Sequence, residues 1–407
     1  MIALRNRNFR LYWLGQAVSN TGNWMQVVAL GWFILQINSS PLALGLLGLA
    51  QSVPFFMFSL PGGMLADRFT RLNVLIVTQT ALMVLAIALA LLVLIGKPPL
   101  WSLLLVATLA AMVTAIDNPA RQAFLSDLVP KEMLLNAIAL NASVYNGAAV
   151  IGPSLAGILL LSIGAAGCFL LNAISFLAVL AALLIIRGRT EDNVQIEAKA
   201  SAVLPQRPLR LLTFTPLRHE YAILAVLVVA AAASLLGRPY LTLMPAFARL
   251  VQHVGPAGLG LMVAASGLGS LIGSILLASL RTPKRLEGLL IICGACFSLA
   301  LATFALVSSL LPTLLILVFC GAGATMTMAT ANTLLQMKAP AHVRGRVMSL
   351  YTLIAAGFTP LGALLITGLG TAISLAGATV AGALGIMVII AGYRLLLSST
   401  IIADQHV

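Results

Sequence analysis

Two charged side chains, Asp117 and Arg238, lie inside segments of the sequence that are otherwise apolar. A charge inside a bilayer is costly, so both residues are functional candidates by default. A carboxylate there can carry a proton, and a guanidinium can hold an anionic group. Counting along the predicted helices places Asp117 near the inner boundary and Arg238 in the outer half, roughly 20 Å apart along the membrane normal. We therefore do not expect them to pair with each other.

Each of these residues also has a simpler interpretation. Asp117 can form a structural salt bridge to Arg71 or Arg121 as readily as it can carry a coupling proton. Arg238 can be satisfied by backbone carbonyls, by water, by Tyr240 or by an anionic substrate, or it can extend to the outer surface. The sequence leaves these alternatives open.

Amide side chains form a stripe on the first predicted helix. Gln16, Asn20 and Asn23 recur at helical spacing, with Trp24 beside them, and hydrocarbon would penalise them on a lipid-facing side. Thr325, Asn332 and Gln336 form a similar stripe on the tenth helix. We expect both stripes to face a central cavity; hydrogen bonds that only hold the helices together are the alternative.

A short loop after the second helix reads Gly62-Gly63-Met64-Leu65-Ala66-Asp67-Arg68-Phe69-Thr70-Arg71. Gly63 permits close helix approach, and Asp67 can cap a helix or pair with a cation. Arg68 supports the membrane orientation, while Arg71 can reach carboxylates or the terminal carbonyls of a helix from the other half. These four residues are predicted to form a reversible cytoplasmic gate. The second half keeps Gly273 and Arg281 but has Leu277 in place of the acid, so the gate is asymmetric.

Small residues also cluster in the fifth predicted helix, where Gly147, Gly152, Pro153 and Gly157 allow tight packing and a bend. The eighth helix offers a small face of its own, made of Ser266, Gly269 and Gly273. We predict that these two helices pack together and seal an outer vestibule. Packing unrelated to transport direction is the alternative, because Gly and Pro are common in membrane helices.

Enzymatic and cofactor chemistry finds no support in the motifs. The four histidines, His219, His253, His342 and His406, fall in predicted loops or the tail. No nucleotide-binding Gly-x-x-x-x-Gly-Lys-Ser/Thr sequence occurs, and the pair Cys293 and Cys296 has no partner ligands at metal-binding spacing. We therefore predict that the chain is not an enzyme and that it has no cofactor and no metal site.

The elements that must position these residues are membrane helices. The 407 residues are 61% hydrophobic and 8% charged, and the apolar blocks form twelve segments of about 20 residues, enough to cross a bilayer. Twenty of the 23 Lys and Arg residues then fall on one side, which predicts that both termini are cytoplasmic. The net charge of +13 is spread over short loops, so it does not indicate nucleic-acid binding.

The sequence divides into two similar halves. A polar stretch over residues 188–218 is predicted to be a cytoplasmic linker between six-helix bundles at 1–187 and 219–407. Shifting the second half by 210 residues aligns six glycines of the first half with six of the second, as expected for a repeat. The aligned pairs are Gly45 with Gly255, Gly48 with Gly258, Gly63 with Gly273, Gly147 with Gly357, Gly152 with Gly362, and Gly167 with Gly377.

Two parallel six-helix repeats and the Gly-x-x-x-Asp-Arg-x-x-Arg loop resemble the major facilitator superfamily of transporters. The Gly147–Gly157 segment resembles an exporter-associated element, although Ala156 replaces one glycine. The stretch around Asp117-Asn118-Pro119 and the Arg238-Pro239 pair are similar to the branch that includes enterobactin exporters and transmembrane secretion effectors. The resemblance implies an all-helical fold with a substrate site between the halves.

We therefore predict a secondary active exporter of a siderophore-like or drug-like small molecule, located in the cytoplasmic membrane and driven by proton antiport. Its expected partners are the substrate, protons and lipid, and we expect a monomer. An importer or lipid flippase of the same fold and a non-transporting receptor or scaffold are the alternatives.

Overall fold

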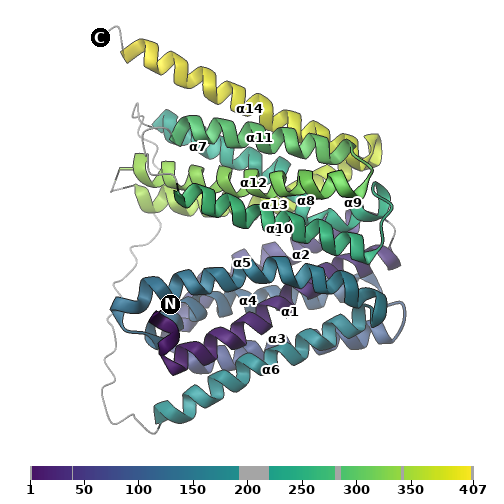
Figure 1. The fold of residues 1–407 in the computed structure, drawn as a ribbon, viewed down its shortest axis with the longest axis vertical. Coiled ribbons are helices and arrows are strands. Elements are labelled where there is room, and N and C mark those ends of the chain that lie inside the picture. The colour runs from purple at the N-terminus through teal and green to yellow at the C-terminus, as the bar shows by residue number, and fades with distance from the viewer. Residues whose placement is uncertain (1, 39, 192–219, 280–285, 341–342, 405–407) are drawn as a thin grey trace.

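The described part of the protein is entirely helical. The computed structural model describes residues 2–38, 40–191, 220–279, 286–340 and 343–404, and every regular element in these ranges is a helix. The predicted linker therefore lies almost wholly outside the described residues. Figure 1 shows two stacked groups of helices whose long axes run in roughly the same direction. This is the two-bundle architecture that the sequence predicts.

The first bundle holds a short 3-10 helix and six long α-helices. They are η1 (Ile2–Arg5), α1 (Arg7–Ile37), α2 (Leu42–Arg68), α3 (Arg71–Leu94), α4 (Leu100–Leu128), α5 (Lys131–Ser162) and α6 (Gly164–Glu191). The connections between the long helices are short, so consecutive helices run in opposite directions. We call the end that carries η1 and Arg71 the basic end, and the end at which α1 stops and α2 begins the distal end.

The second bundle repeats this order with one interruption. Its helices are α7 (Glu220–Ala232), the π-helical turn η2 (Ala233–Gly237), α8 (Pro239–Thr242), α9 (Met244–Leu250), α10 (Pro256–Ser279), α11 (Leu286–Leu306), α12 (Leu310–Lys338), α13 (Arg344–Ile373) and α14 (Leu375–Asp404). α12 starts and ends 210 residues after α4. The bounds of this pair of helices thus follow the offset at which the glycines align.

The interruption divides the seventh membrane crossing into α7, η2, α8 and α9. Pro239 and Pro245 lack the backbone N–H that a continuous helix would use, and the Arg238 N–H bonds the Ala233 carbonyl across a wider turn. Leu243 leaves the helical region with φ −91° and ψ 0°. Two prolines six residues apart therefore break this crossing into short pieces.

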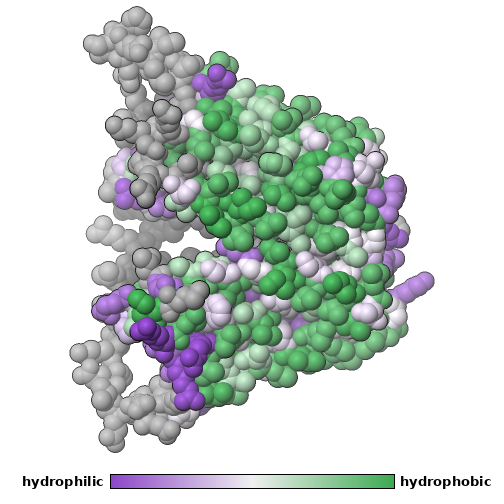
Figure 2. Space-filling model, viewed as in Figure 1, coloured by the Kyte–Doolittle hydropathy of each residue, from purple (hydrophilic) through white to green (hydrophobic). Residues whose placement is uncertain are grey.

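The outer surface fits a membrane protein. Ten helical spans of the described chain are long and apolar enough to cross a bilayer, with α7 through α8 counted as one. The other two predicted crossings are α1, which carries the amide stripe, and α2, which is apolar over Leu42–Phe58. Figure 2 shows apolar side chains over the middle of the visible face, with hydrophilic ones gathered toward its two ends.

The two bundles meet mainly through α5 with α10 and α2 with α13. Near the distal end a Cβ on Gly260 would lie 2.5 Å from the Pro153 carbonyl oxygen, and one on Gly48 would lie 3.4 Å from Pro360. Closer to the basic end Gly147 has open space around it. Figure 2 shows a recess between the bundles that opens on the side where the N-terminal residues lie. The bundles are therefore closed together at the distal end and apart at the basic end.

The predicted contact between the fifth and eighth crossings is present as α5 against α10, but with a different face of α10. Gly260 and Gly267 face α5, where Gly267 approaches the Ala149 carbonyl. Ser266, Gly269 and Gly273, which were predicted to make this contact, instead lie toward α12 within their own bundle. α10 carries small residues on two sides, and the sequence alone does not rank those sides.

The α10–α12 contact gives a direct test of this packing. A Cβ at Gly321 would overlap the Ser266 carbonyl oxygen, which belongs to a helix backbone, so Gly321→Ala should destabilise the protein by about 1–3 kcal/mol. Gly392→Ala is the matched control, because nothing lies within 4 Å of its Cβ position. The measurement is the thermal unfolding temperature in detergent. Equal temperatures for both variants would show that α10 and α12 are not packed this closely.

Candidate functional site

A buried carboxylate stands at the centre of the first bundle. Asp117 on α4 is fully buried, and its Oδ1 accepts hydrogen bonds from Thr78 Oγ1 at 2.7 Å and Gln79 Nε2 at 2.8 Å, both on α3. Its Oδ2 accepts a bond from Arg121 Nε at 3.0 Å and another from Arg121 Nη2. Asp117 and Arg121 are four residues apart on α4 and form an ion pair. Of the two salt-bridge partners that the sequence suggested, the structure has Arg121.

Arg121 extends this network to α1. Its Nη1 donates to Gln16 Oε1, and Asn20 Nδ2 donates to the Gln16 backbone oxygen at 2.9 Å and to Oε1 at 3.3 Å. The Tyr12 hydroxyl is buried in the same region and makes no hydrogen bond in the structure. We call Asp117, Arg121, Gln16, Thr78 and Gln79 the acid network. It ties α1, α3 and α4 together through one charged pair.

The first amide stripe is therefore used largely inside the first bundle. Gln16 is 1% exposed and belongs to the acid network, so it does not line a cavity as predicted. Asn23 accepts a bond from Asn172 of α6 at 3.3 Å. Asn20 is half-buried. Thr78, Gln79 and Asn172 are not among the predicted site residues; their one signal is that each is a hydrogen-bonding residue in an apolar helix.

Arg238 lies where the seventh crossing is broken. Its Nη1 donates to the Ala355 carbonyl of α13 at 3.0 Å, and Ala355 is in the middle third of that helix. Side chains on a helix lean toward its N-terminus, which for α7 and α8 is the basic end. The guanidinium therefore turns toward the middle of the bundle and does not extend to the distal surface. Arg238 is half-buried, and Asp117, the one acid predicted inside a crossing, is already paired with Arg121.

Two aromatic side chains of the first bundle form a pair. Trp24 of α1 and Tyr145 of α5 pack edge to face with their ring centroids 5.9 Å apart. Tyr145 is 55% exposed, and it lies on α5, the helix that contacts α10 of the second bundle. Sequence analysis missed Tyr145, although it lies two residues before Gly147. Arg238, Trp24 and Tyr145 together form what we call the central site, to which both bundles contribute.

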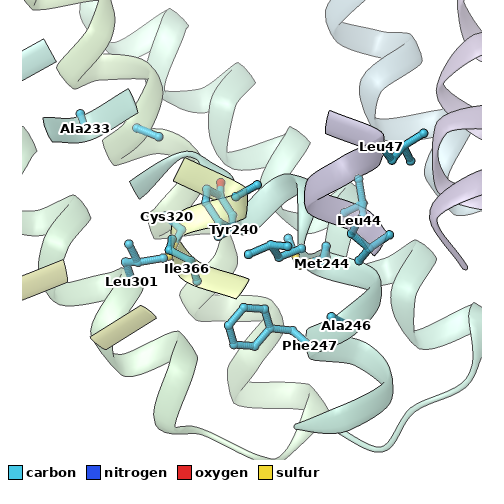
Figure 3. Packing of buried hydrophobic residues seen from close by; sticks show 14 of the residues in the cluster. Leu44, Leu47, Ala233, Tyr240, Met244, Ala246, Phe247, Leu301, Cys320 and Ile366 are labelled. Atoms are coloured by element: carbon cyan, nitrogen blue, oxygen red, sulfur yellow. The ribbon is translucent and has the colours of Figure 1, made fainter. Parts of the chain in front are cut away.

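Tyr240 does not belong to this central site. It is 1% exposed, shares a 2.6 Å hydrogen bond with the Ser266 hydroxyl, and packs against Phe297 and Phe304. Figure 3 shows it among buried apolar residues of the second bundle. Tyr240 was predicted as a cavity residue that could satisfy the Arg238 guanidinium, but a spacing of two residues puts the two side chains on different sides of the helix.

The second amide stripe lies on α12. Thr325 and Asn332 are half-buried, and Gln336 is exposed and donates to Asn332 Oδ1 at 2.7 Å. These residues leave part of their polar surface accessible, unlike Gln16. Their predicted contact with a substrate stays a prediction.

The predicted gate motif is described only in part. Gly63, Asp67 and Arg68 lie in the last turns of α2, where side chains fall outside the described ones. Arg71 pairs with Asp127 of α4 at 2.6 Å and approaches the Ala123 carbonyl at 3.4 Å. Its partners among the described residues thus belong to its own bundle.

The small residues of α5 face two different helices. A Cβ on Gly152 would lie 2.6 Å from the Thr21 carbonyl of α1, whereas one on Gly157 would lie 3.1 Å from the Gly260 Cα of α10. Pro153 lies between them and directs its carbonyl at Gly260. α5 is therefore held at close range both to its own bundle and to the second one, and Gly147 lies just where the second contact ends.

No cluster of three or more His, Cys, Asp or Glu side chains that could hold a metal ion occurs among the described residues. Of the histidines, His253 lies in the connection before α10, and the other three fall outside the described ranges. The site is thus one of charges, amides and aromatic rings.

Comparison with known proteins agrees with this architecture. The family model described as "Transmembrane secretion effector" matches residues 1–406. The Enterobactin exporter of Citrobacter koseri is 28% identical over 92% of this chain and 88% of its own. The Staphyloferrin A transporter of Staphylococcus aureus is 26% identical over 85% of both chains, and the Multidrug efflux pump Tap of Mycolicibacterium fortuitum is 24% identical over 85% of both.

Solved structures show the same fold at lower sequence identity. A peptide transporter POT has a TM-score of 0.74 at 15% identity over 97% of this chain and 95% of its own. A bacterial homologue of the iron transporter ferroportin in an inward-facing state has a TM-score of 0.69 at 17% identity over 95% of this chain and 98% of its own. The all-helical, two-bundle fold is thereby confirmed.

The burial of the Asp117–Arg121 pair predicts a large effect on stability. Arg121→Gln removes one partner and leaves a buried carboxylate unpaired, so it should lower the free energy of unfolding by about 3–5 kcal/mol. Combining it with Asp117→Asn should restore part of that loss. Asp127→Asn breaks an exposed pair and should cost about 1 kcal/mol or less. Unfolding temperatures in detergent measure all three, and a neutral Arg121→Gln would contradict the network.

Proposed function

Because the chain belongs to the transmembrane secretion effector family of major facilitator transporters, we propose that it exports a small molecule across the cytoplasmic membrane by alternating access coupled to proton antiport. Its relatives include proteins named as exporters of enterobactin and of multiple drugs. The observation that carries the proposal is the recess between the bundles, which is open at the basic end and closed at the distal end. An exporter must admit its cargo from the cytoplasm in such a state.

The orientation follows from charge. The basic end carries Arg71, Lys338 and Arg344 at helix termini, and an excess of Lys and Arg marks cytoplasmic loops. The recess then opens to the cytoplasm. Cargo would enter there and leave when the distal contact of α5 with α10 opens and the basic end closes.

The central site supports an anionic cargo. Arg238 donates one N–H to the Ala355 carbonyl. The other N–H groups of its guanidinium can donate to a carboxylate or phenolate of the cargo. Trp24 and Tyr145 add ring surface from the other bundle. A cargo held between Arg238 and these rings contacts both bundles at once, so its binding would respond to their relative movement.

The acid network supports proton coupling. Asp117 is the one carboxylate predicted inside a membrane crossing, and a proton on it would cancel the charge that holds Arg121. Arg121 also bonds Gln16 of α1, and α1 carries Trp24. Protonation of Asp117 would therefore weaken the hydrogen bonds that hold α1, α3 and α4 together. A resulting movement of α1 would shift Trp24 in the central site.

Transport direction and cargo are tested together. Mass spectrometry of cell extracts and medium from deletion and overexpressing strains should reveal one compound that is retained by the first strain and released by the second. An anionic, amphipathic compound is expected. A compound that the overexpressing strain accumulates inside would indicate an importer, and no change in either strain would indicate a non-transporting protein.

The central site predicts that Arg238→Gln weakens cargo binding. Loss of hydrogen bonds to a charged group costs about 1.5–3 kcal/mol. The concentration of the identified cargo that gives half-maximal transport should therefore rise about 10-fold to 100-fold. Membrane abundance should be nearly unchanged. Arg394→Gln, an exposed arginine on α14, is the control and should behave as wild type. Unchanged half-saturation in Arg238→Gln would remove Arg238 from the site.

The acid network predicts a separate defect for Asp117→Asn. In proteoliposomes this variant should still exchange cargo across the membrane, because exchange needs no net proton movement, but an imposed pH gradient should no longer drive accumulation. Glu132→Gln, at an exposed position in the first turn of α5, should keep the gradient response. A folded Asp117→Asn protein with full gradient-driven transport would show that the proton travels elsewhere.

A further inference from the structure

The short helix α9 of the second bundle lies against the distal end of α1 in the first. A Cβ on Gly31 of α1 would lie 2.9 Å from the Pro245 ring of α9. Met244, Ala246, Phe247 and Ala248 of α9 are all fully buried. Figure 3 shows Met244 and Leu44 of α2 within one buried cluster. α9 therefore closes the distal end by apolar packing between the bundles.

The end of α1 presents carbonyl groups that need donors. The last four carbonyls of a helix have no intrahelical partner, and together they carry a partial negative charge. In α1 the Ile34 carbonyl accepts the N–H of Asn38, and α1 has no basic residue in its last turn. Its own sequence thus leaves the negative end of the helix without a neutralising cation.

Arg249 of α9 supplies that cation from the other bundle. Its Nη1 donates to the Leu35 carbonyl, two residues before α1 ends. A charge-assisted bond of this kind is stronger than a neutral one, and Arg249 is half-buried, which limits screening by solvent. It is also one of only two cations that the sequence places on the distal side, the other being Lys97.

We propose that Arg249 is a positioning residue that latches the distal gate: by capping the C-terminus of α1 across the bundle interface, it holds the transporter open to the cytoplasm. The latch must break for cargo to leave. The inference rests on the alternating access in the proposed function, but it concerns the balance of conformations and requires neither a particular cargo nor a coupling ion.

α9 is built to release as a unit. Leu243 has bridge-region dihedrals, and Pro245 occupies the first turn of α9. The break separates α9 from α8, so α9 can tilt through rotation at Leu243 without disturbing Arg238. In the first half of the repeat the same position is the unbroken end of α1. One rigid helix end and one hinged segment therefore meet at the distal gate.

The test is a distance measurement across the distal opening. Spin labels at Leu42→Cys and Gly255→Cys, both exposed and on different bundles, are placed in a protein whose four native cysteines are replaced, and pulsed electron resonance is recorded in lipid nanodiscs without cargo. Arg249→Ala should add a longer-distance population and change the open-to-closed ratio about tenfold, the effect of about 1.4 kcal/mol. Arg249→Lys, which retains the charge, should recover part of the closed population.

Controls separate this result from a folding defect. Lys97→Ala removes the other distal cation, which is exposed and lies in the connection before α4, and should leave the distances unchanged. Gly31→Val leaves Arg249 in place but pushes Pro245 away, so it should also lengthen the distances. The latch is disproved if Arg249→Ala is folded by its thermal transition and keeps the wild-type distribution. If Arg249→Ala does not fold, Arg249→Met, which keeps the apolar stem but has no donor, takes its place, and a wild-type distribution in that variant disproves the latch. Failure of the export experiments would not alter these distances.

Discussion

In hydrocarbon, a polar group that finds no partner inside the protein has no partner at all, and this constraint accounts for the internal design of the first bundle. One carboxylate at Asp117 requires a cation, and Arg121 supplies it one helical turn away. The carboxylate oxygen of Asp117 that does not bond Arg121 requires hydrogen-bond donors, which Thr78 and Gln79 provide from α3. The remaining donor capacity of Arg121 requires an acceptor, which Gln16 provides from α1. Three helices are thereby fixed to one another by satisfying a single charge.

At the positions equivalent to the acid network, the second bundle packs without charged side chains. At the repeat offset of 210, Asp117 corresponds to Thr327, Arg121 to Ala331 and Gln16 to Val226, and all three counterparts are fully buried. Thr327 bonds its own helix at Gly323, and aromatic contacts of Tyr240, Phe297, Phe304 and Phe247 fill the core. A proton could bind Asp117 and change the helix contacts of the first bundle, but the equivalent positions of the second bundle hold no carboxylate. Duplicated architecture therefore carries unequal chemistry, as the different gate loops of the two halves already indicated.

Much of the fold could be predicted from the sequence because membrane helices follow from length and hydropathy. The twelve crossings, the two bundles and the contact between the fifth and eighth crossings all follow from apolar runs, the glycine repeat and small-residue clusters. The failures concern rotation about a helix axis. Ser266, Gly269 and Gly273 face α12 and not α5, Tyr240 turns into its own bundle, and Gln16 turns into the acid network. Helical periodicity groups residues on one side, but which neighbour that side meets depends on tertiary packing that no local pattern contains.

The broken seventh crossing shows how such packing becomes a functional arrangement. A continuous helix from Glu220 to Leu250 would have satisfied every backbone group internally and left no reason for Arg238 to seek a carbonyl of α13. The prolines at 239 and 245 remove backbone donors, and the π-helical turn rotates the residues that follow it by a fraction of a turn. Arg238 then bonds the Ala355 carbonyl near the middle of the bundle, and Arg249 bonds the Leu35 carbonyl at its distal end. Two guanidinium groups on one interrupted crossing thus contact the backbone of two different neighbours, and the break at Leu243 lets the contact at the central site and the contact at the distal end change separately.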